Sequence, residues 1–65
     1  MNTITINGLA YKLPEEQNIL SSVLNHLDMV KNGTKKFIKL YDLDGMEHKF
    51  STTYLNSVEI DVKID

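Results

Sequence analysis

The chain has 65 residues, of which 42% are apolar and 25% are charged, and its formal net charge is −2. A chain this short forms one domain, residues 1–65, and buries only about 60% of its unfolded surface. The absence of cysteine excludes disulfides, thiolate metal sites and thiol nucleophiles. The mild acidity argues against non-specific nucleic-acid binding, which favours a basic surface.

No apolar run approaches the roughly 18 residues of a membrane span. The first residues also lack the basic region and the apolar stretch of a signal peptide. We therefore expect a soluble, cytoplasmic protein that makes no contact with a membrane.

The opening stretch TITINGLAYKLPEE, residues 3–16, predicts a β-hairpin that leads into a helix. Asn7-Gly8 is a strong signal for a two-residue turn, because both central residues of a type I′ turn need positive φ. This turn would place the apolar residues of both strands on one face. The predicted pairs are Ile6 with Leu9, Thr5 with Ala10, Ile4 with Tyr11, and Thr3 with Lys12.

Residues 14–31 predict the helix. Pro14 suits the first helical position, and Glu15 and Glu16 suit the positive end of the helix dipole. Asn32-Gly33 supplies a left-handed stop. Apolar residues recur at helical spacing, which indicates one face packed on a sheet. They are Ile19, Leu20, Val23, Leu24, Leu27 and Val30.

The second half predicts three strands. Residues 36–41 and 46–50 flank the turn sequence DLDG, residues 42–45. A four-residue loop would pair Phe37 with Phe50, whereas a three-residue loop with a bulge would pair Ile38 with Phe50, and both alternatives stay open. Residues 51–57 predict a polar connection. Residues 58–65 alternate strictly between apolar and polar, as a half-buried strand does.

The element order is therefore ββαβββ, and the fold class is α+β. One helix would cover one face of a four- or five-stranded mixed sheet, with the first and last strands side by side in the middle. The predicted core consists of Ile4, Ile6, Leu9, Tyr11, Leu13, Ile19, Leu20, Val23, Leu24, Leu27, Val30, Phe37 or Ile38, Leu40, Phe50, Val58, Ile60, Val62 and Ile64.

By its opening stretch and its element order, the chain resembles the β-grasp proteins. These include ubiquitin, the sulfur carriers of thiamine and molybdopterin synthesis, and small immunoglobulin-binding domains. The resemblance implies a β-grasp architecture. Ubiquitin and the sulfur carriers act through a Gly-Gly tail, whereas this chain ends in Lys63-Ile64-Asp65, and plant-type ferredoxins need four cysteines. The functions of these families therefore do not carry over.

Two features could carry chemistry, and each has a plainer interpretation. The sequence DLDG is similar to the start of a calcium loop, but the twelfth position from Asp42 is Thr53, not glutamate, so a hairpin turn is favoured. His26 falls on the polar side of the helix and His48 in a strand. Neither has a second histidine, a cysteine or a paired serine at the spacing of a catalytic or metal site. We expect no catalytic residue, no cofactor and no metal.

Lysines interleaved with aromatic residues could form a small nucleic-acid-binding patch. They would serve equally well as solubilising residues that block pairing at a sheet edge. Charge is also divided unevenly, because residues 1–41 carry five lysines and three acids while residues 42–65 carry two lysines and six acids. The patch residues are Lys31, Lys35, Lys36, Lys39, Phe37 and Tyr41.

The outer face of the predicted helix is uncharged. At about 100° per residue, the direction opposite the apolar stripe holds Asn18, Ser21, Ser22, Asn25 and Met29. A solvated helix face normally carries lysine and glutamate, whereas small polar residues around a methionine suit the close approach of a partner. A plain polar face with one exposed methionine is the alternative.

We therefore expect a small non-enzymatic protein-binding module that acts as a regulator or inhibitor by occupying a partner protein's surface. Phages and mobile elements encode many such proteins, and the lysine-, isoleucine- and asparagine-rich composition fits an AT-rich genome. The alternatives are a nucleic-acid-binding module that uses the lysine–aromatic strand, and a ubiquitin-like carrier that has lost its Gly-Gly tail. A homodimer formed through a sheet edge is also open.

Overall fold

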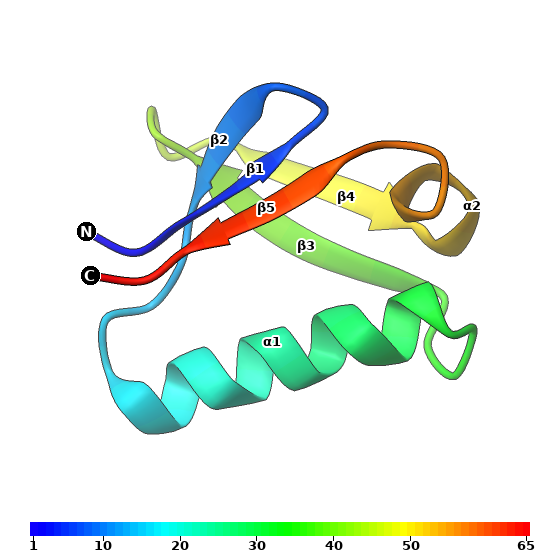
Figure 1. Cartoon of the computed structure of the whole chain (residues 1–65), viewed down its shortest axis with the longest axis horizontal. Coiled ribbons are helices and arrows are strands. Elements are labelled where there is room, and N and C mark those ends of the chain that lie inside the picture. Colours follow the sequence, from blue (N-terminus) through cyan, green and yellow to red (C-terminus); the bar gives the residue numbers. More distant parts are fainter.

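The computed structural model describes residues 1–65 and contains one sheet and two helices. Helix α1 lies across one face of the sheet, and α2 forms a single turn between the last two strands (Figure 1). The α+β class and the packing of one long helix on a sheet are confirmed. In chain order the elements are β1 (Thr3–Ile6), β2 (Leu9–Lys12), α1 (Gln17–Lys31), β3 (Phe37–Asp42), β4 (Glu47–Ser51), α2 (Thr52–Leu55) and β5 (Ile60–Lys63).

The strand order is β4-β3-β2-β1-β5, and every neighbouring pair is antiparallel. The first and last strands are neighbours, as expected, but the predictions of a mixed sheet and of a central last strand are wrong. Strand β3 occupies the free edge of β2, so the second hairpin extends the sheet on that side. The last strand then pairs with the remaining edge of β1 and becomes an edge strand itself. The β-grasp resemblance therefore extends to element order and not to strand order.

The first hairpin has the register predicted from its turn. All four predicted pairs, from Ile6 with Leu9 to Thr3 with Lys12, are observed. Asn7 and Gly8 have φ values of 52° and 84°, which are the positive values that a type I′ turn requires.

The second hairpin has the three-residue loop with a bulge. Ile38 lies opposite Phe50, the Asp42 backbone N–H donates to the Met46 carbonyl at 3.0 Å, and Gly45 has a φ of 87°. This register settles which face of β3 is buried. Ile38 packs towards the helix, and Phe37 is 46% exposed on the outer face.

Helix α1 begins later than expected. Its first residue is Gln17, not Pro14, because residues 13–16 carry the chain from the sheet to the helix layer. The Leu13 backbone N–H donates to the Asn2 carbonyl at 3.0 Å, and the Asn2 side chain donates to the Pro14 carbonyl at 2.9 Å. The helix ends as predicted, with Gly33 at a φ of 88°.

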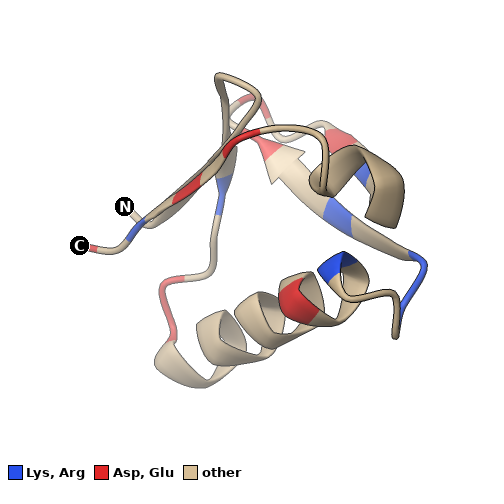
Figure 2. Ribbon diagram, turned by 45° about the vertical axis from the view of Figure 1, so that its right-hand side comes forward, with Lys and Arg blue, Asp and Glu red and all other residues tan.

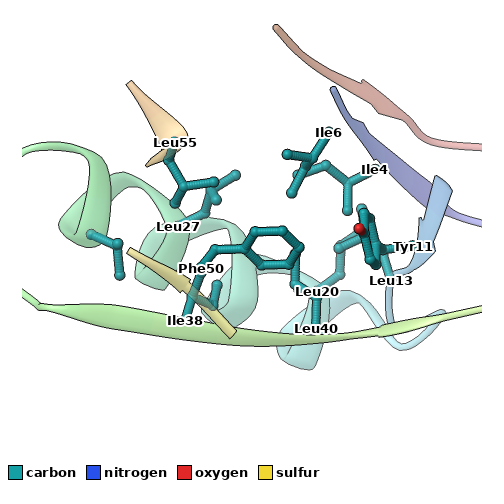
Figure 3. Packing of buried hydrophobic residues seen from close by; sticks show 11 residues of the cluster. Ile4, Ile6, Tyr11, Leu13, Leu20, Leu27, Ile38, Leu40, Phe50 and Leu55 are labelled. Carbon is teal, nitrogen blue, oxygen red and sulfur yellow. The ribbon is translucent and has the colours of Figure 1, made fainter. Parts of the chain in front are cut away.

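The core lies between α1 and the inner face of the sheet (Figure 3). Four residues predicted to be buried are exposed, because they lie at the margins where the helix and the sheet no longer cover each other. They are Leu9, Ile19, Val62 and Ile64. Of the alternatives Phe37 and Ile38, Ile38 is the buried residue. Conversely, the polar connection predicted for residues 51–57 contains α2, whose Leu55 is fully buried. The buried cluster consists of Ile4, Ile6, Tyr11, Leu13, Leu20, Leu27, Val30, Ile38, Leu40, Phe50 and Leu55.

The two chain ends lie together at one corner of the sheet (Figure 1). The N-terminal ammonium group pairs with the Asp65 carboxylate, and the Asp65 backbone N–H donates to the Asn2 side chain. Neither helix is both long and apolar enough to cross a bilayer.

Candidate functional site

The outer face of α1 carries the five predicted partner-binding residues, on the side of the helix turned away from the buried Leu20 and Leu27. Four of the five are exposed, and Met29 is half-buried. The only lysine or acidic residues of α1 are Asp28 and Lys31, so residues 17–27 present no formal charge apart from the titratable His26 (Figure 2). The exposed residues are Asn18, Ser21, Ser22 and Asn25.

An apolar side chain borders this uncharged face. Ile19 is 49% exposed and lies three residues before Ser22, which makes the two side chains neighbours on the helix surface. Ile19 was predicted to be buried, because its position belongs to the apolar stripe of the sequence. In the fold it lies at the margin of the packed stripe, and it adds apolar surface beside the small polar residues.

The outer face of the sheet gathers part of the predicted lysine–aromatic patch. Phe37, Lys39 and Tyr41 alternate along β3 with the buried Ile38 and Leu40, so they share this face. The other lysines of the predicted patch lie outside the sheet, at the end of α1 and in the connection to β3. Those lysines are Lys31, Lys35 and Lys36.

The strand pairing adds two lysines that sequence analysis did not group with the patch. Lys12 lies opposite Tyr41, and Lys49 lies opposite Lys39, with its ammonium nitrogen 4.1 Å from the Phe37 ring centroid. Glu47 partly balances this charge, because it accepts a hydrogen bond from the Tyr41 hydroxyl and lies 3.8 Å from the Lys39 ammonium. Cross-strand neighbours depend on register, which the sequence left open for this hairpin.

A cavity of about 270 Å³ opens where the pairing between β2 and β3 stops. The last pair of this ladder is Tyr11 with Asp42, because β3 ends at Asp42, whereas Leu9 and Ala10 of β2 have no partner on β3. Apolar side chains form the walls, and two carboxylates and an imidazole complete the lining. The lining residues are Leu9, Ala10, Tyr11, Asp42, Leu43, Asp44 and His48.

Asp42 organises the polar side of this cavity. Its carboxylate lies 2.8 Å from His48 Nε2 and accepts the backbone N–H groups of Asp44 and Met46. The hydrogen bond with His48, followed by that from Met46, lowers the pKa of the Asp42 carboxyl, because both favour the ionised form. Burial, with smaller effects of Tyr54 and Asp42, raises the pKa of Tyr11.

His48 was expected to be a surface or rim residue, and the structure shows it half-buried in the lining of the cavity. Its ring packs edge-on against Tyr11 with centroids 5.3 Å apart. The bulged register would have indicated the contact between Asp42 and His48, since it pairs Asp42 with Met46 and makes His48 a diagonal neighbour of Asp42. No serine, threonine, cysteine or lysine lines the cavity to act as a nucleophile beside this pair.

Comparison of the chain with protein-family models, with curated proteins and with solved structures gave no match. Within the structure, no group of three or more histidine and acidic side chains is placed to hold a metal ion. The uncharged helix face and the lysine–aromatic sheet face are two exposed features that packing within the chain does not explain.

Proposed function

We propose that this protein is a small, cytoplasmic, non-enzymatic binding module that acts as a regulator or inhibitor by covering a partner protein's surface. In this proposal the contact is made by the outer face of α1, and a phage or mobile element is the proposed source. The observation that carries it is the absence of lysine and acidic residues from residues 17–27, whose outward-facing Asn18, Ser21, Ser22 and Asn25 are exposed (Figure 2).

The composition of this face suits a protein interface. Interface centres are depleted in charged residues, because a buried charge must lose its water shell. Small side chains such as Ser21 and Ser22 let a second backbone approach closely, while Met29 can adapt its shape to an irregular partner. The exposed Ile19 supplies apolar area at the border.

The test begins with capture of partners by the tagged protein from its native cells, followed by mass spectrometry and measurement of affinity for the purified partner. Charge is then placed at the centre of the face with Ser22→Glu and Asn25→Lys. We expect each variant to weaken binding by about tenfold or more, because a charge would be buried without a counter-ion.

Thr53→Glu is the matched control, since Thr53 is exposed on α2, away from the outer face of α1. It should change the affinity by no more than about twofold, as a charge outside the contact does. Binding within about threefold of wild type in both helix variants would show that the contact lies elsewhere. Met29→Lys gives a further test at the half-buried end of the face.

A second candidate function is nucleic-acid binding on the outer face of the sheet. The observation in its favour is the exposure of Phe37 and Tyr41 on one strand with Lys12, Lys39 and Lys49 around them. Exposed aromatic rings on a sheet can stack on unpaired bases. A fluorescence titration with single-stranded oligonucleotides would show affinity that falls steeply with salt, and no binding at low salt would exclude this function.

A ubiquitin-like carrier is supported only by the order of the elements, because the strand order is not that of the expected β-grasp sheet. Incubation with an activating enzyme and ATP tests this third possibility. Formation of an adenylate or thioester would support it, and neither product is expected.

A further inference from the structure

Strand β5 leaves one row of backbone groups unpaired. It is an edge strand, and its only strand neighbour is β1 (Figure 1). The Asn7 N–H donates to the Glu59 carbonyl at 3.0 Å, which fixes the phase of this ladder. Because hydrogen-bonded pairs alternate in antiparallel strands, Asp61 and Lys63 direct their backbone groups towards β1, whereas Ile60 and Val62 direct theirs towards the free edge.

This phase restricts how a second β5 strand could pair antiparallel with the first. Outward-directed residues must face outward-directed residues, and the two-fold axes that pair Val62 with an outward-directed residue among residues 60–64 of the second copy pass through Asp61, Val62 or Lys63. An axis at Asp61 would place the Asp61 carboxylates of the two copies opposite each other, and an axis at Lys63 would do the same with the two Lys63 ammonium groups. An axis at Val62 sets Asp61 opposite Lys63 of the second copy, and does so twice by symmetry.

We propose that two copies of this chain pair edge to edge through β5, with Val62 opposite Val62 of the second copy and Asp61 opposite Lys63. The two sheets then form one continuous antiparallel sheet. The Asp61–Lys63 contacts occur at non-hydrogen-bonded positions, where side chains on opposite strands come closest. This interface is separate from the binding face on α1, so either proposal can fail without the other.

Two properties of β5 distinguish it from β4, the other edge strand. None of the ion pairs within the chain includes Asp61 or Lys63, so both are free to pair with a second copy. On β4, Glu47 is held by Lys39 and Tyr41, and Lys49 lies over the Phe37 ring.

Apolar side chains in β5 and directly after it are also only partly buried. Val62 lies on the inner face of the sheet and is 39% exposed, and Ile64, directly after the strand, is 49% exposed. Pairing at Val62 would bring these side chains of the two copies together, with Ile64 next to Ile60 of the second copy. The proposed dimer therefore buries apolar surface that the single chain leaves in water.

Sedimentation equilibrium and light scattering test the dimer and its register in one series. The wild type should show a dimer fraction that rises with protein concentration. Asp61→Lys and Lys63→Asp should each raise the dissociation constant about tenfold or more, because each places like charges in opposition twice. The double variant D61K/K63D restores opposite charges and should return the constant to within about threefold of wild type.

Lys49→Asp makes the same change on the other edge strand and should leave the dimer intact. Amide hydrogen exchange gives a second readout, in which the N–H groups of Ile60 and Val62 gain protection as concentration rises while that of Asp61 is protected throughout. A wild type that stays monomeric at about 1 mM would overturn the proposal, as would single variants that dimerise normally or a double variant that fails to recover while still folded.

Discussion

The two hairpins of this protein are built from the same kind of elements but differ in how firmly the sequence specifies them. The β1–β2 hairpin turns through Asn7-Gly8, and its four pairs follow directly from that two-residue loop. The β3–β4 hairpin turns through three residues, and its register depends on the Asp42 side chain, which accepts the N–H groups of Asp44 and Met46.

The difference lies in the strands as much as in the turns. Thr3–Ile6 alternates polar and apolar residues, so a shift by one residue would move its whole apolar set to the wrong face. Strand β3 has apolar or aromatic residues on both faces, with Phe37 and Tyr41 on one and Ile38 and Leu40 on the other. Its hydrophobic pattern therefore permits two registers, and the loop decides between them.

Truncating adjacent residues of β3 should give the largest effect and tests the second register directly. Ile38→Ala removes a side chain that is only 3% exposed, and we expect it to lower the free energy of unfolding by about 3 kcal/mol. Phe37→Ala should cost less than about 1 kcal/mol, because its ring lies on the outer face. Urea denaturation monitored by circular dichroism measures both.

The alternative four-residue loop would reverse this ranking, since Phe37 would then face the helix. A larger loss in Phe37→Ala than in the Ile38 variant would therefore contradict the observed register. If Ile38→Ala does not fold, Ile38→Val should still lower the free energy of unfolding by about 1 kcal/mol.

The turn glycines test whether both hairpins depend on positive φ to the same degree. Gly8 and Gly45 have φ values of 84° and 87°, and no atom lies within 4 Å of a Cβ added at either position. Gly8→Ala and Gly45→Ala should each cost about 1–2 kcal/mol through backbone strain alone.

Asparagine provides the control at both turns, because its short polar side chain tolerates the left-handed conformation better than alanine does. Gly45→Asn should therefore lose less stability than Gly45→Ala, as measured by urea denaturation. Equal losses for alanine and asparagine would show that something other than φ makes glycine necessary there.

The sequence predicted those parts of the fold that depend on neighbours in the chain. The first hairpin's register, the stop of α1 at Gly33 and most of the helix stripe follow from local pattern and turn chemistry. Strand order was not accessible in this way, because the pairing of β2 with β3 rests on only two residue pairs and brings together strands separated by a helix. The edge position of β5 follows from that pairing and was missed with it.

The candidate surfaces also differ in whether they depend on local sequence pattern or on the pairing of distant strands. The uncharged face of α1 depends only on helical periodicity, and four of its five residues are exposed as expected. The Asp42–His48 pair, by contrast, needs the bulged register, and the cavity beside it lies where the pairing of β2 with β3 ends at Asp42. Neither of these can be read from one segment of the sequence.

Acid pH should destabilise the β3–β4 hairpin through protonation of Asp42. The hydrogen bonds from His48 and Met46 hold the pKa of Asp42 below its unfolded value of about 3.9. Their stabilisation is fully present above that unfolded pKa and is lost as the pH falls through the lower, folded pKa. The stability advantage of the wild type over Asp42→Asn should thus shrink below about pH 4.

Thermal unfolding measured from pH 7 down to acid gives this difference curve. Asp44→Asn controls for the loss of one negative charge from the same loop, and its carboxylate has no hydrogen-bond partner in the chain. An advantage that stays constant down to acid pH would mean that the ionised Asp42 carboxylate does not stabilise the turn.

The smallest effect is expected within the hairpin that the sequence specified best. Ile6 and Leu9 lie opposite each other on the same face, yet Ile6 is 1% exposed and Leu9 is 63% exposed at the mouth of the cavity. Leu9→Ala should change the free energy of unfolding by no more than about 0.5 kcal/mol, whereas Ile6→Ala should cost about 3 kcal/mol. A similar loss of stability in both variants would show that α1 also covers Leu9, at the turn end of the β1–β2 hairpin, and would contradict the observed exposure of Leu9. Unequal losses would show that strand register determines which face a residue occupies, while the reach of α1 and α2 determines whether that face is covered.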